Sequence, residues 1–419
     1  MPSKKTVPLV SVAERITVGF VGPMADEYVE NGIPFLRSLN VKRFRFNSDD
    51  LKYISEDFHR KIKKSTLWPG DVVIVRTGVP GASCVIPKSL NEANCSDLVI
   101  IRCGPKLDPY FASYYINSIT ASHINGKLVG AIQQHFNIGE AKQIAFPDIG
   151  LSHQKRISSV LSALDAKIEI NNAINAELEG MAKLLYDYWF VQFDFPLTAA
   201  QAASLGRPEL EGHPYKSSGG PMVHNTTLNR PIPAGWNAVE LQDIAQITMG
   251  QSPPGESYND HAEGELFFQG STDFGWRFPE PRQYTTAATR IAKKGDILLS
   301  VRAPVGTLNI APFKCAIGRG LSALRSKDGH DAFLFFVMQS FKQIFDRRNG
   351  DGTTFGSINR DDLRSLKLVL PPKELIQKYE DLAAKNNEMI FINHQQNQEL
   401  TALRDWLLPM LMNGQVTVG

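Results

Sequence analysis

Two clusters of cations and aromatic residues in the first third of the chain are suited to binding nucleic acid. One cluster is VKRFRF at 41–46, and the other is RKIKK at 60–64. Lysine and arginine neutralise phosphates, and arginine also donates paired hydrogen bonds to guanine in the major groove. A solvated helix face or an edge strand would give the same pattern. Our candidate DNA contacts here are Lys42, Arg43, Arg45, Arg60, Lys61, Lys63 and Lys64.

Further candidate DNA contacts lie in segments that contain glycine or follow β-branched runs. Arg76 and Arg302 each follow such a run, and Arg319 is flanked by two glycines that let the backbone approach a ligand closely. Arg319 could equally stabilise a turn. The other candidates are the amides of Gln133 and Gln134, which suit adenine, Thr353 and Thr354 in the loop NGDGTTFGS, and Arg277.

The motifs of an enzyme are missing from the sequence. Neither Pro-Pro pair is followed by the aromatic residue of an adenine methyltransferase loop, and no GxxxxGK[ST] phosphate loop is present. Glu140 and Lys142, with Asp108 upstream, resemble a nuclease triplet, but the second half of the chain lacks it. Cys84, Cys95, Cys103 and Cys315 form no CxxC pair, so we expect buried, reduced thiols. We therefore expect no catalysis, no metal and no cofactor in this chain.

The sequence contains an internal repeat, which must position these candidates. GDVVIVRTGVPG at 70–81 returns as GDILLSVRAPVG at 295–306, and NIGEAKQIAFP at 137–147 matches DLRSLKLVLP at 362–371. Pairs such as Ile170-Asn171 also recur 222 positions later, as Ile392-Asn393. A slowly drifting offset is what loop-length differences between two copies produce.

Each copy has a β-rich region followed by a long helix. Short β-branched runs separated by Gly, Pro and Asn predict strands, and a helix is expected near 331–347 among them. The fold class is therefore α+β with an internal pseudo-twofold repeat. The predicted parts are β-rich globular regions at 1–150 and 236–371, long helices at 151–195 and 372–412, and a linker at 196–235 with little capacity to form a core.

The two long helices have the 4-3 spacing of a coiled coil and should pair with each other, antiparallel. In the second helix the spacing runs through Tyr379, Leu382, Asn386, Met389, Asn393, Gln396, Leu400, Leu403 and Leu407. Alternatively, each helix packs only on its own domain. The residues expected at the helix interface are Ile157, Leu164, Ile168, Asn171, Leu178, Leu185, Trp189, Tyr379, Asn393, Leu400 and Leu407.

Composition sets the broad class of the protein. With 419 residues, 42% of them hydrophobic and 21% charged, the chain can form more than one core. The net charge of the chain is only +2. Residues 1–150 alone have a net charge of +4, which is a weaker basic bias than most DNA readers show. No run of 18 apolar residues and no signal-like start is present, so we expect a cytoplasmic protein without a membrane partner.

The centre of the chain resembles a known family. LLYDYWFVQFDFP at 184–196, GHPYKSSGGPM at 212–222 and IPAGW at 232–236 are similar to the central region of type I restriction-modification specificity subunits. WNAVELQDIAQITMGQSPPGESYND at 236–260 and LFFQGSTDFGW at 266–276 resemble the start of the target recognition domains in that family. The likeness covers essentially the whole chain, including the duplication.

The resemblance implies that each β-rich region reads one half of a bipartite, asymmetric site in double-stranded DNA. The helices would be a spacer and a docking surface for two methyltransferase subunits, and motor-nuclease subunits would join for restriction. AdoMet, ATP and Mg²⁺ would belong to those partners. Two other functions remain open: a coiled-coil scaffold without DNA specificity, and the recognition part of a bifunctional restriction enzyme.

Overall fold

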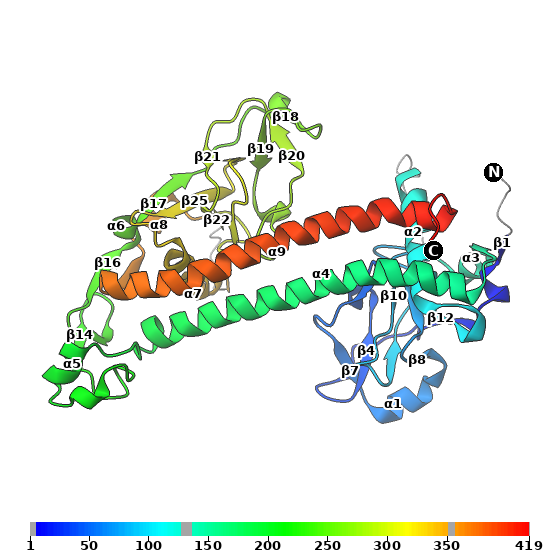
Figure 1. The fold of residues 1–419 in the computed structure, drawn as a ribbon, viewed down its shortest axis with the longest axis horizontal. Helices are drawn as coiled ribbons and strands as arrows, with labels where there is room; N and C mark the ends of the chain where they lie inside the picture. The colour runs from blue at the N-terminus through cyan, green and yellow to red at the C-terminus, as the bar shows by residue number, and fades with distance from the viewer. Residues whose placement is uncertain (1–5, 127–135, 351–356, 419) are drawn as a thin grey trace. The chain divides into compact units, whose positions relative to one another are not determined.

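The computed structural model describes residues 6–126, 136–350 and 357–418, which form two compact units. Unit 1 comprises residues up to Asn171 together with Gln395–Gly419, and unit 2 comprises Asn172–His394. The boundary passes through both long helices, α4 (Leu151–Tyr186) and α9 (Lys373–Asn413), so each unit contains one half of each helix (Figure 1). We describe the units one at a time.

Unit 1 holds a recognition domain of two main sheets. The four-stranded antiparallel sheet has β2 (Arg15–Val18), β12 (Leu98–Arg102), β9 (Val72–Val75) and β10 (Ser83–Val85) in that order. The five-stranded sheet has β3 (Tyr28–Val29), β7 (Lys52–Ile54), β4 (Ile33–Leu36), β11 (Ala93–Cys95) and β8 (Thr66–Leu67). Both faces of β9 and most of β12 are buried, which explains their unbroken apolar runs.

Unit 2 holds the second recognition domain, and its strands repeat the order of the first. Its four-stranded sheet has β17 (Ala245–Met249), β25 (Leu321–Ser326), β22 (Ile297–Ser300) and β23 (Leu308–Ile310). Its five-stranded sheet has β18 (Tyr258–Asn259), β20 (Gln283–Thr285), β19 (Glu265–Phe268), β24 (Cys315–Ile317) and β21 (Ile291–Ala292). In each five-stranded sheet one central pair is parallel: β4 with β11, and β19 with β24.

Helices complete each domain in the same way. The longer ones are α2 (Pro109–Gly126) in unit 1 and α7 (Asp331–Gly350) in unit 2, the second where the sequence predicts it. The short helices α3 (Ile138–Gln143) and α8 (Arg360–Arg364) both begin with an asparagine cap, because the side chains of Asn137 and Asn359 accept backbone N–H bonds. A strand follows each short helix, β13 (Ala145–Pro147) or β26 (Lys367–Leu370), paired with β1 (Thr6–Pro8) or β16 (Asn237–Glu240). The four cysteines are buried free thiols.

The two long helices pair antiparallel in each unit. In unit 1, Asn171 Nδ2 donates to Gln396 Oε1 at 2.7 Å and Arg404 Nη1 donates to Asp165 Oδ1 at 2.7 Å. In unit 2, Asn393 Nδ2 donates to Asn175 Oδ1 at 2.9 Å, and Tyr379 Oη donates to the carbonyl oxygen of Ala182 at 3.0 Å. Higher numbers on one helix meet lower numbers on the other, as the prediction of an antiparallel pair requires.

The phase of the second helix differs from the predicted one. Ala383 and Ile390 are buried, whereas their neighbours Leu382 and Met389 are 51% and 47% exposed. The expected positions Leu382 and Met389, and likewise the exposed Leu403, are therefore wrong. The predicted spacing and the observed spacing share the positions seven residues apart, such as Tyr379 and Asn393, and differ by one residue between them. The spacing alone therefore does not determine which of the intermediate residues is buried.

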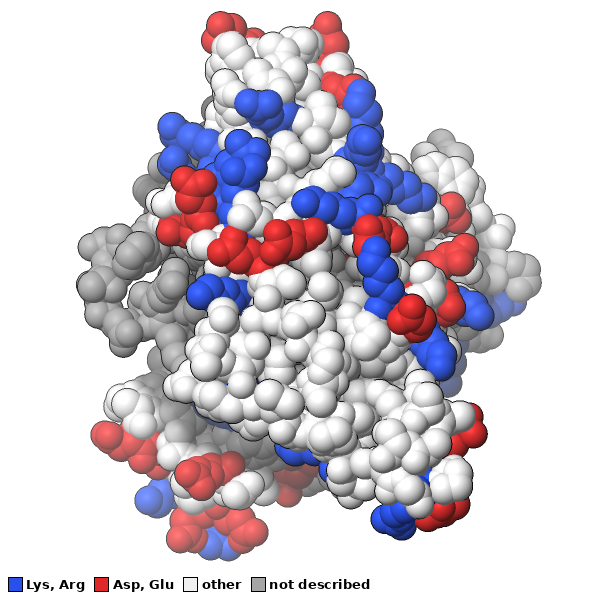
Figure 2. All heavy atoms as spheres, turned by 90° about the vertical axis from the view of Figure 1, so that its left-hand side faces the viewer, with Lys and Arg blue, Asp and Glu red and all other residues white. Residues whose placement is uncertain are grey.

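The segment predicted as a linker without a core is a small folded body, which corrects that expectation. It contains α5 (Ala199–Ser204) and the hairpin of β14 (Met222–Asn225) and β15 (Arg230–Pro233). The ring of Phe195 stacks between Tyr215 and Trp236, with ring centroids 4.5 and 4.9 Å away. These aromatic residues are far apart in sequence, so no local pattern announces their cluster. Figure 2 faces the side on which α5 and β14 lie, where charged side chains gather above and below a broad uncharged area.

None of the helices in the described parts of the chain is long and apolar enough to cross a membrane.

Candidate nucleic-acid interface

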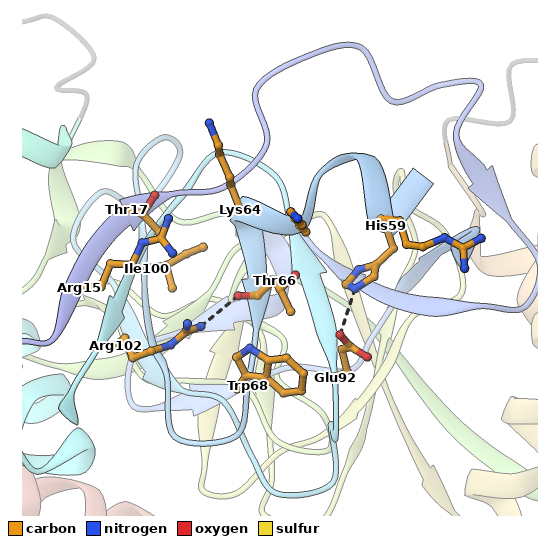
Figure 3. Close-up of a pocket in the computed structure, with 11 residues that line it drawn as sticks. Arg15, Thr17, His59, Lys64, Thr66, Trp68, Glu92, Ile100 and Arg102 are labelled. Atoms are coloured by element: carbon orange, nitrogen blue, oxygen red, sulfur yellow. Dashed lines mark hydrogen bonds and ion pairs between the residues drawn. The ribbon is translucent and has the colours of Figure 1, made fainter. Parts of the chain in front are cut away.

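A basic pocket in the recognition domain of unit 1 is the best-defined candidate site. It has a volume of about 620 Å³ and lies between β2, the end of β12, β8 and α1 (Glu56–Lys61) (Figure 3). Five cations line it, and the full lining is Arg15, Thr17, His59, Arg60, Lys63, Lys64, Thr66, Trp68, Glu92, Ile100 and Arg102. This pocket brings together Arg60, Lys63 and Lys64, three of the four predicted cations of the segment 60–64, whereas Lys61 is exposed but does not line it.

The pocket wall is held rigid by a buried carboxylate. Asp71 Oδ2 accepts the backbone N–H of Trp68 and Nη2 of Arg102, both at 2.9 Å, and Oδ1 accepts Nε of Arg102 at 3.1 Å. The hydrogen bonds that Arg102 donates to Asp71, together with the charge of that carboxylate, raise the pKa of Arg102. Arg102 and the backbone of Trp68 are therefore fixed before any ligand arrives.

The opposite wall of the pocket is organised by His59. Its ring accepts or donates at both nitrogens: Nε2 lies 3.1 Å from Glu92 Oε1, and Nδ1 lies 3.2 Å from Nδ2 of Asn94. Because the Asn94 amide nitrogen can only donate, His59 Nδ1 accepts and Nε2 carries the proton toward Glu92. The carboxylate of Glu92 is thereby oriented, as Figure 3 shows.

Three of the five cations in the pocket form no ion pair with a described carboxylate. Arg60 pairs with Asp57 and Arg102 with Asp71. Among the described residues, no ion pair holds Arg15, Lys63 or Lys64, and all three side chains belong to exposed residues. The pocket therefore offers free positive charge beside an exposed indole, a combination that suits nucleic acid.

The same framework in unit 2 carries different exposed residues. Asp296 accepts the backbone N–H of Lys293 at 2.7 Å and Nε of Arg325 at 2.5 Å, which repeats the Asp71–Arg102 arrangement. By the strand register, Gln246 and Lys293 take the positions of Arg15 and Trp68. Residues 286–290 directly join β20 to β21, where unit 1 has α1 between β7 and β8. The cation-rich pocket wall is thus a feature of the first domain.

Of the predicted DNA contacts outside the pocket, some are exposed and others are already bonded to groups of the protein. Lys42 and Arg45 are exposed on the hairpin of β5 (Val41–Lys42) and β6 (Arg45–Phe46). Arg43, between these strands, donates to the carbonyl oxygen of Asn117 at 2.9 Å, and burial lowers its pKa. Arg76 is bound to Asp97 and to the carbonyl oxygen of Phe136.

Two predicted arginines of unit 2 are exposed in the segments next to β22 and β25, which are neighbouring strands of the four-stranded sheet. Arg302 follows β22, and Arg319 precedes β25 between Gly318 and Gly320. A Cβ on Gly320 would lie 2.7 Å from the carbonyl oxygen of Gln269, so glycine is needed to bring Arg319 onto this tight turn. Gln133, Gln134, Thr353 and Thr354 lie outside the described residues.

Arg277 is buried, which corrects its assignment as a DNA contact. Only 2% of its side chain is exposed, and its guanidinium donates to Glu179 Oε1 at 3.0 Å and Asn387 Oδ1 at 2.6 Å. It also lies over the ring of Phe335 at 3.8 Å, and burial lowers its pKa. Arg277 therefore joins the loop after β19 to both long helices. An arginine in an aromatic-rich segment gives no sequence signal that separates these two roles.

The two carboxylates of the suspected nuclease triplet have structural tasks. Glu140 Oε2 accepts the backbone N–H of Asn137 at 3.0 Å, and Asp108 Oδ1 accepts that of Phe111 at 2.8 Å at the start of α2. Nowhere in the described residues do three His, Cys, Asp or Glu side chains gather in a way that could hold a metal ion.

The eleven residues predicted at the interface of the two long helices are all buried or half-buried. Other apolar residues of the same helices are exposed. Ile157, Asn171, Tyr379 and Asn393 are buried, and the other predicted interface residues are half-buried. Unit 1 exposes Ile170, Leu403 and Trp406, and unit 2 exposes Ile392, Met181 and Leu184. Ile170 and Ile392 are 222 positions apart, and so are Met181 and Leu403, and Leu184 and Trp406. The internal repeat therefore includes these exposed apolar residues.

Sequence reasoning missed Arg15, Arg102, His59 and Trp68. Trp68 directly precedes the Pro-Gly-Asp turn that opens the repeated segment, and an exposed tryptophan at a repeated turn is a usable signal. Arg15 and Arg102 are adjacent only because β2 and β12 pair, so nothing local reveals them.

Comparison with known proteins gives one consistent family. Residues 233–402 match the type I restriction modification DNA specificity domain. The putative type I restriction enzyme MjaX specificity subunit of Methanocaldococcus jannaschii is 27% identical over 401 residues, covering 92% of this chain and 88% of the relative. The MjaIX specificity subunit of the same organism is 26% identical, covering 94% and 88%. The solved S subunit of a type I restriction-modification system from M. genitalium has the same fold, with a TM-score of 0.58, 13% identity and coverage of 98% and 96%.

Proposed function

We propose that this chain is a DNA specificity subunit of a type I restriction-modification system, and that its two recognition domains each read one half of a bipartite, asymmetric DNA site. The relatives named as specificity subunits align along nearly the whole chain, through both copies of the repeat. The function is therefore recognition, and the chemistry of methylation and cleavage would belong to partner subunits with their AdoMet, ATP and Mg²⁺.

One observation carries this proposal: the two domains share the same strands and the same Asp–Arg pair but differ in their surface residues. The Asp71–Arg102 and Asp296–Arg325 pairs lie at matching places, whereas the matching loops differ: the loop after β4 exposes Lys42 and Arg45, and the loop after β19 buries Arg277. Base choice depends on the exposed side chains that reach the groove. Two domains with unlike surfaces should therefore select two unlike half-sites.

The test is to map methylated positions in the DNA of cells that express this chain with its partner methyltransferase. We expect one motif with two specific parts of different sequence separated by nonspecific bases. A palindromic motif, or methylation without any motif, would contradict two unlike readers. Cells with the methyltransferase alone are the control and should show none of these sites.

Two copies of a methyltransferase subunit are the proposed partners of the helices, and motor-nuclease subunits would join them for restriction. The support is the repeated exposed set, in which Leu184 and Trp406 are 68% and 57% exposed. Isolated apolar residues need no explanation, but a set repeated once in each unit suits the same partner bound twice.

Charged substitutions on this set test the partner number. Leu184→Glu and Trp406→Glu should each lower the number of methyltransferase subunits from two to one in a mass measurement of the complex, because each removes apolar area from one docking face. The control is Lys183→Glu, beside Leu184 in the sequence. Loss of both subunits from either single variant would contradict two separate faces.

A further inference from the structure

The pocket of unit 1 has features that recognition of paired bases in a groove does not use. Its volume of about 620 Å³ is the size of a small-molecule site. Reading a base pair requires side chains that project into a groove, whereas these side chains surround a hollow. Figure 3 shows Arg15 and Arg102 on one side of this hollow and His59 and Glu92 on the other.

The cations of the hollow are placed for a phosphate group. Arg15 and Lys64 are unpaired among the described residues, and Arg102 is fixed by Asp71 beside Arg15 on the neighbouring strand. An arginine and a lysine that have no acid partner gain charge-assisted hydrogen bonds when a phosphate arrives. The net positive lining therefore favours one anionic group.

Trp68 is placed for a base. It is 44% exposed although it lines a pocket, and its backbone N–H bond to Asp71 fixes the main chain that carries the indole. Every nucleobase has a flat face, so an exposed indole binds bases of any sequence by stacking. A base within a duplex is already stacked on both faces, so only a base outside the pairs can use this surface.

We propose that the pocket binds one nucleotide that is outside a base-paired stack, with its phosphate at Arg15 and Lys64 and its base on Trp68. This inference rests on the proposed function, because the DNA bound by the first domain is the nearest source of such a nucleotide. A free nucleotide has the same chemistry and is the other source. The matched positions in unit 2, Gln246 and Lys293, offer neither the arginine nor the indole.

The test uses the purified full-length chain and two probes, a fluorescently labelled thymidine octamer and ATP. The variants are Trp68→Ala, Trp68→Phe and Arg15→Gln, which introduces the residue of the second domain. The control is Lys293→Ala, which removes an exposed cation at the matched position of unit 2. Thermal unfolding of every variant is compared with that of the parent chain, and Trp68→Phe retains a stacking ring if Trp68→Ala is unstable.

The proposal predicts that the octamer binds and that Trp68→Ala weakens its binding about tenfold, as loss of one stacked base does. Arg15→Gln should weaken it about fivefold, and Trp68→Phe and Lys293→Ala about twofold or less. Octamer binding that ATP does not displace assigns the site to a DNA strand, and tight ATP binding without octamer binding assigns it to a free nucleotide.

Two results would overturn the proposal. One is that neither probe binds, and the other is that Trp68→Ala and Arg15→Gln weaken only duplex binding, which would make the pocket a backbone clamp. Methylation mapping with the same variants separates this failure from failure of the proposed function. A complex that still recognises its site while the octamer test fails overturns the nucleotide pocket alone.

Discussion

The two recognition domains share their strands and differ in what is inserted between them. In the first domain, the connection from β7 to β8 contains α1 and forms the wall of a basic pocket. In the second, residues 286–290 make that connection directly, and the loop after β19 buries Arg277 against the helices. The comparison teaches that the sheets are a common support, whereas the basic pocket and the buried anchor belong to the connecting segments.

Removing the buried anchor of the second domain should have the largest effect. Arg277→Ala removes a buried cation and leaves the half-buried Glu179 with only the hydrogen bond from Gln339, so we expect unit 2 to lose about 3 kcal/mol of unfolding free energy. Denaturant unfolding measures this loss. Arg282→Ala is the matched control, because Arg282 pairs with Asp273 but is 67% exposed, and should cost less than about 1 kcal/mol. Equal losses for the two variants would mean that Arg277 is no anchor.

Substitution of the shared carboxylates should have an intermediate and similar effect in both domains. Asp71→Ala and Asp296→Ala each leave an arginine and a backbone N–H without their acceptor, which costs about 2 kcal/mol. Unfolding experiments on the two variants compare the domains directly. If only one of them were destabilised, the two domains would not rest on the same support.

The exposed cations of the first domain should have the smallest effect, and only on DNA binding. Lys42→Ala and Arg45→Ala should each reduce the slope of log affinity against log salt for a duplex by about 0.9, the value for one phosphate contact. The measurement is a salt titration of duplex binding by the complex with its methyltransferase. Lys216→Ala, an exposed cation of the small body near α5, is the control. A slope that stays the same in all three variants would remove the hairpin of β5 and β6 from the interface.

The parts of this molecule that could be predicted from the sequence are those that depend on patterns of neighbouring residues. The repeat at Gly70 and Gly295 and the apolar runs of β9 and β22 depend on neighbouring residues. Propensity and periodicity act over such distances, so the fold class and the order of the elements follow from them.

The other parts depend on residues that are distant in sequence, and these were not predictable. Arg15 and Arg102 meet through strand pairing, and Phe195 meets Tyr215 and Trp236 only in the folded body. The helix phase at Ala383 and Ile390 is chosen by the partner helix. In each case, the sequence contains the residues but not the contact that decides their role.

The central claim is that two independent readers share one chain, and a domain exchange tests it most directly. Residues 1–150 are replaced by the equivalent region of a relative, and methylated sites are mapped in cells that also express the methyltransferase. Because contacts in well-separated half-sites contribute additively, we predict that one half of the motif changes and the other half stays the same. A change in both halves, or in neither, would contradict the account.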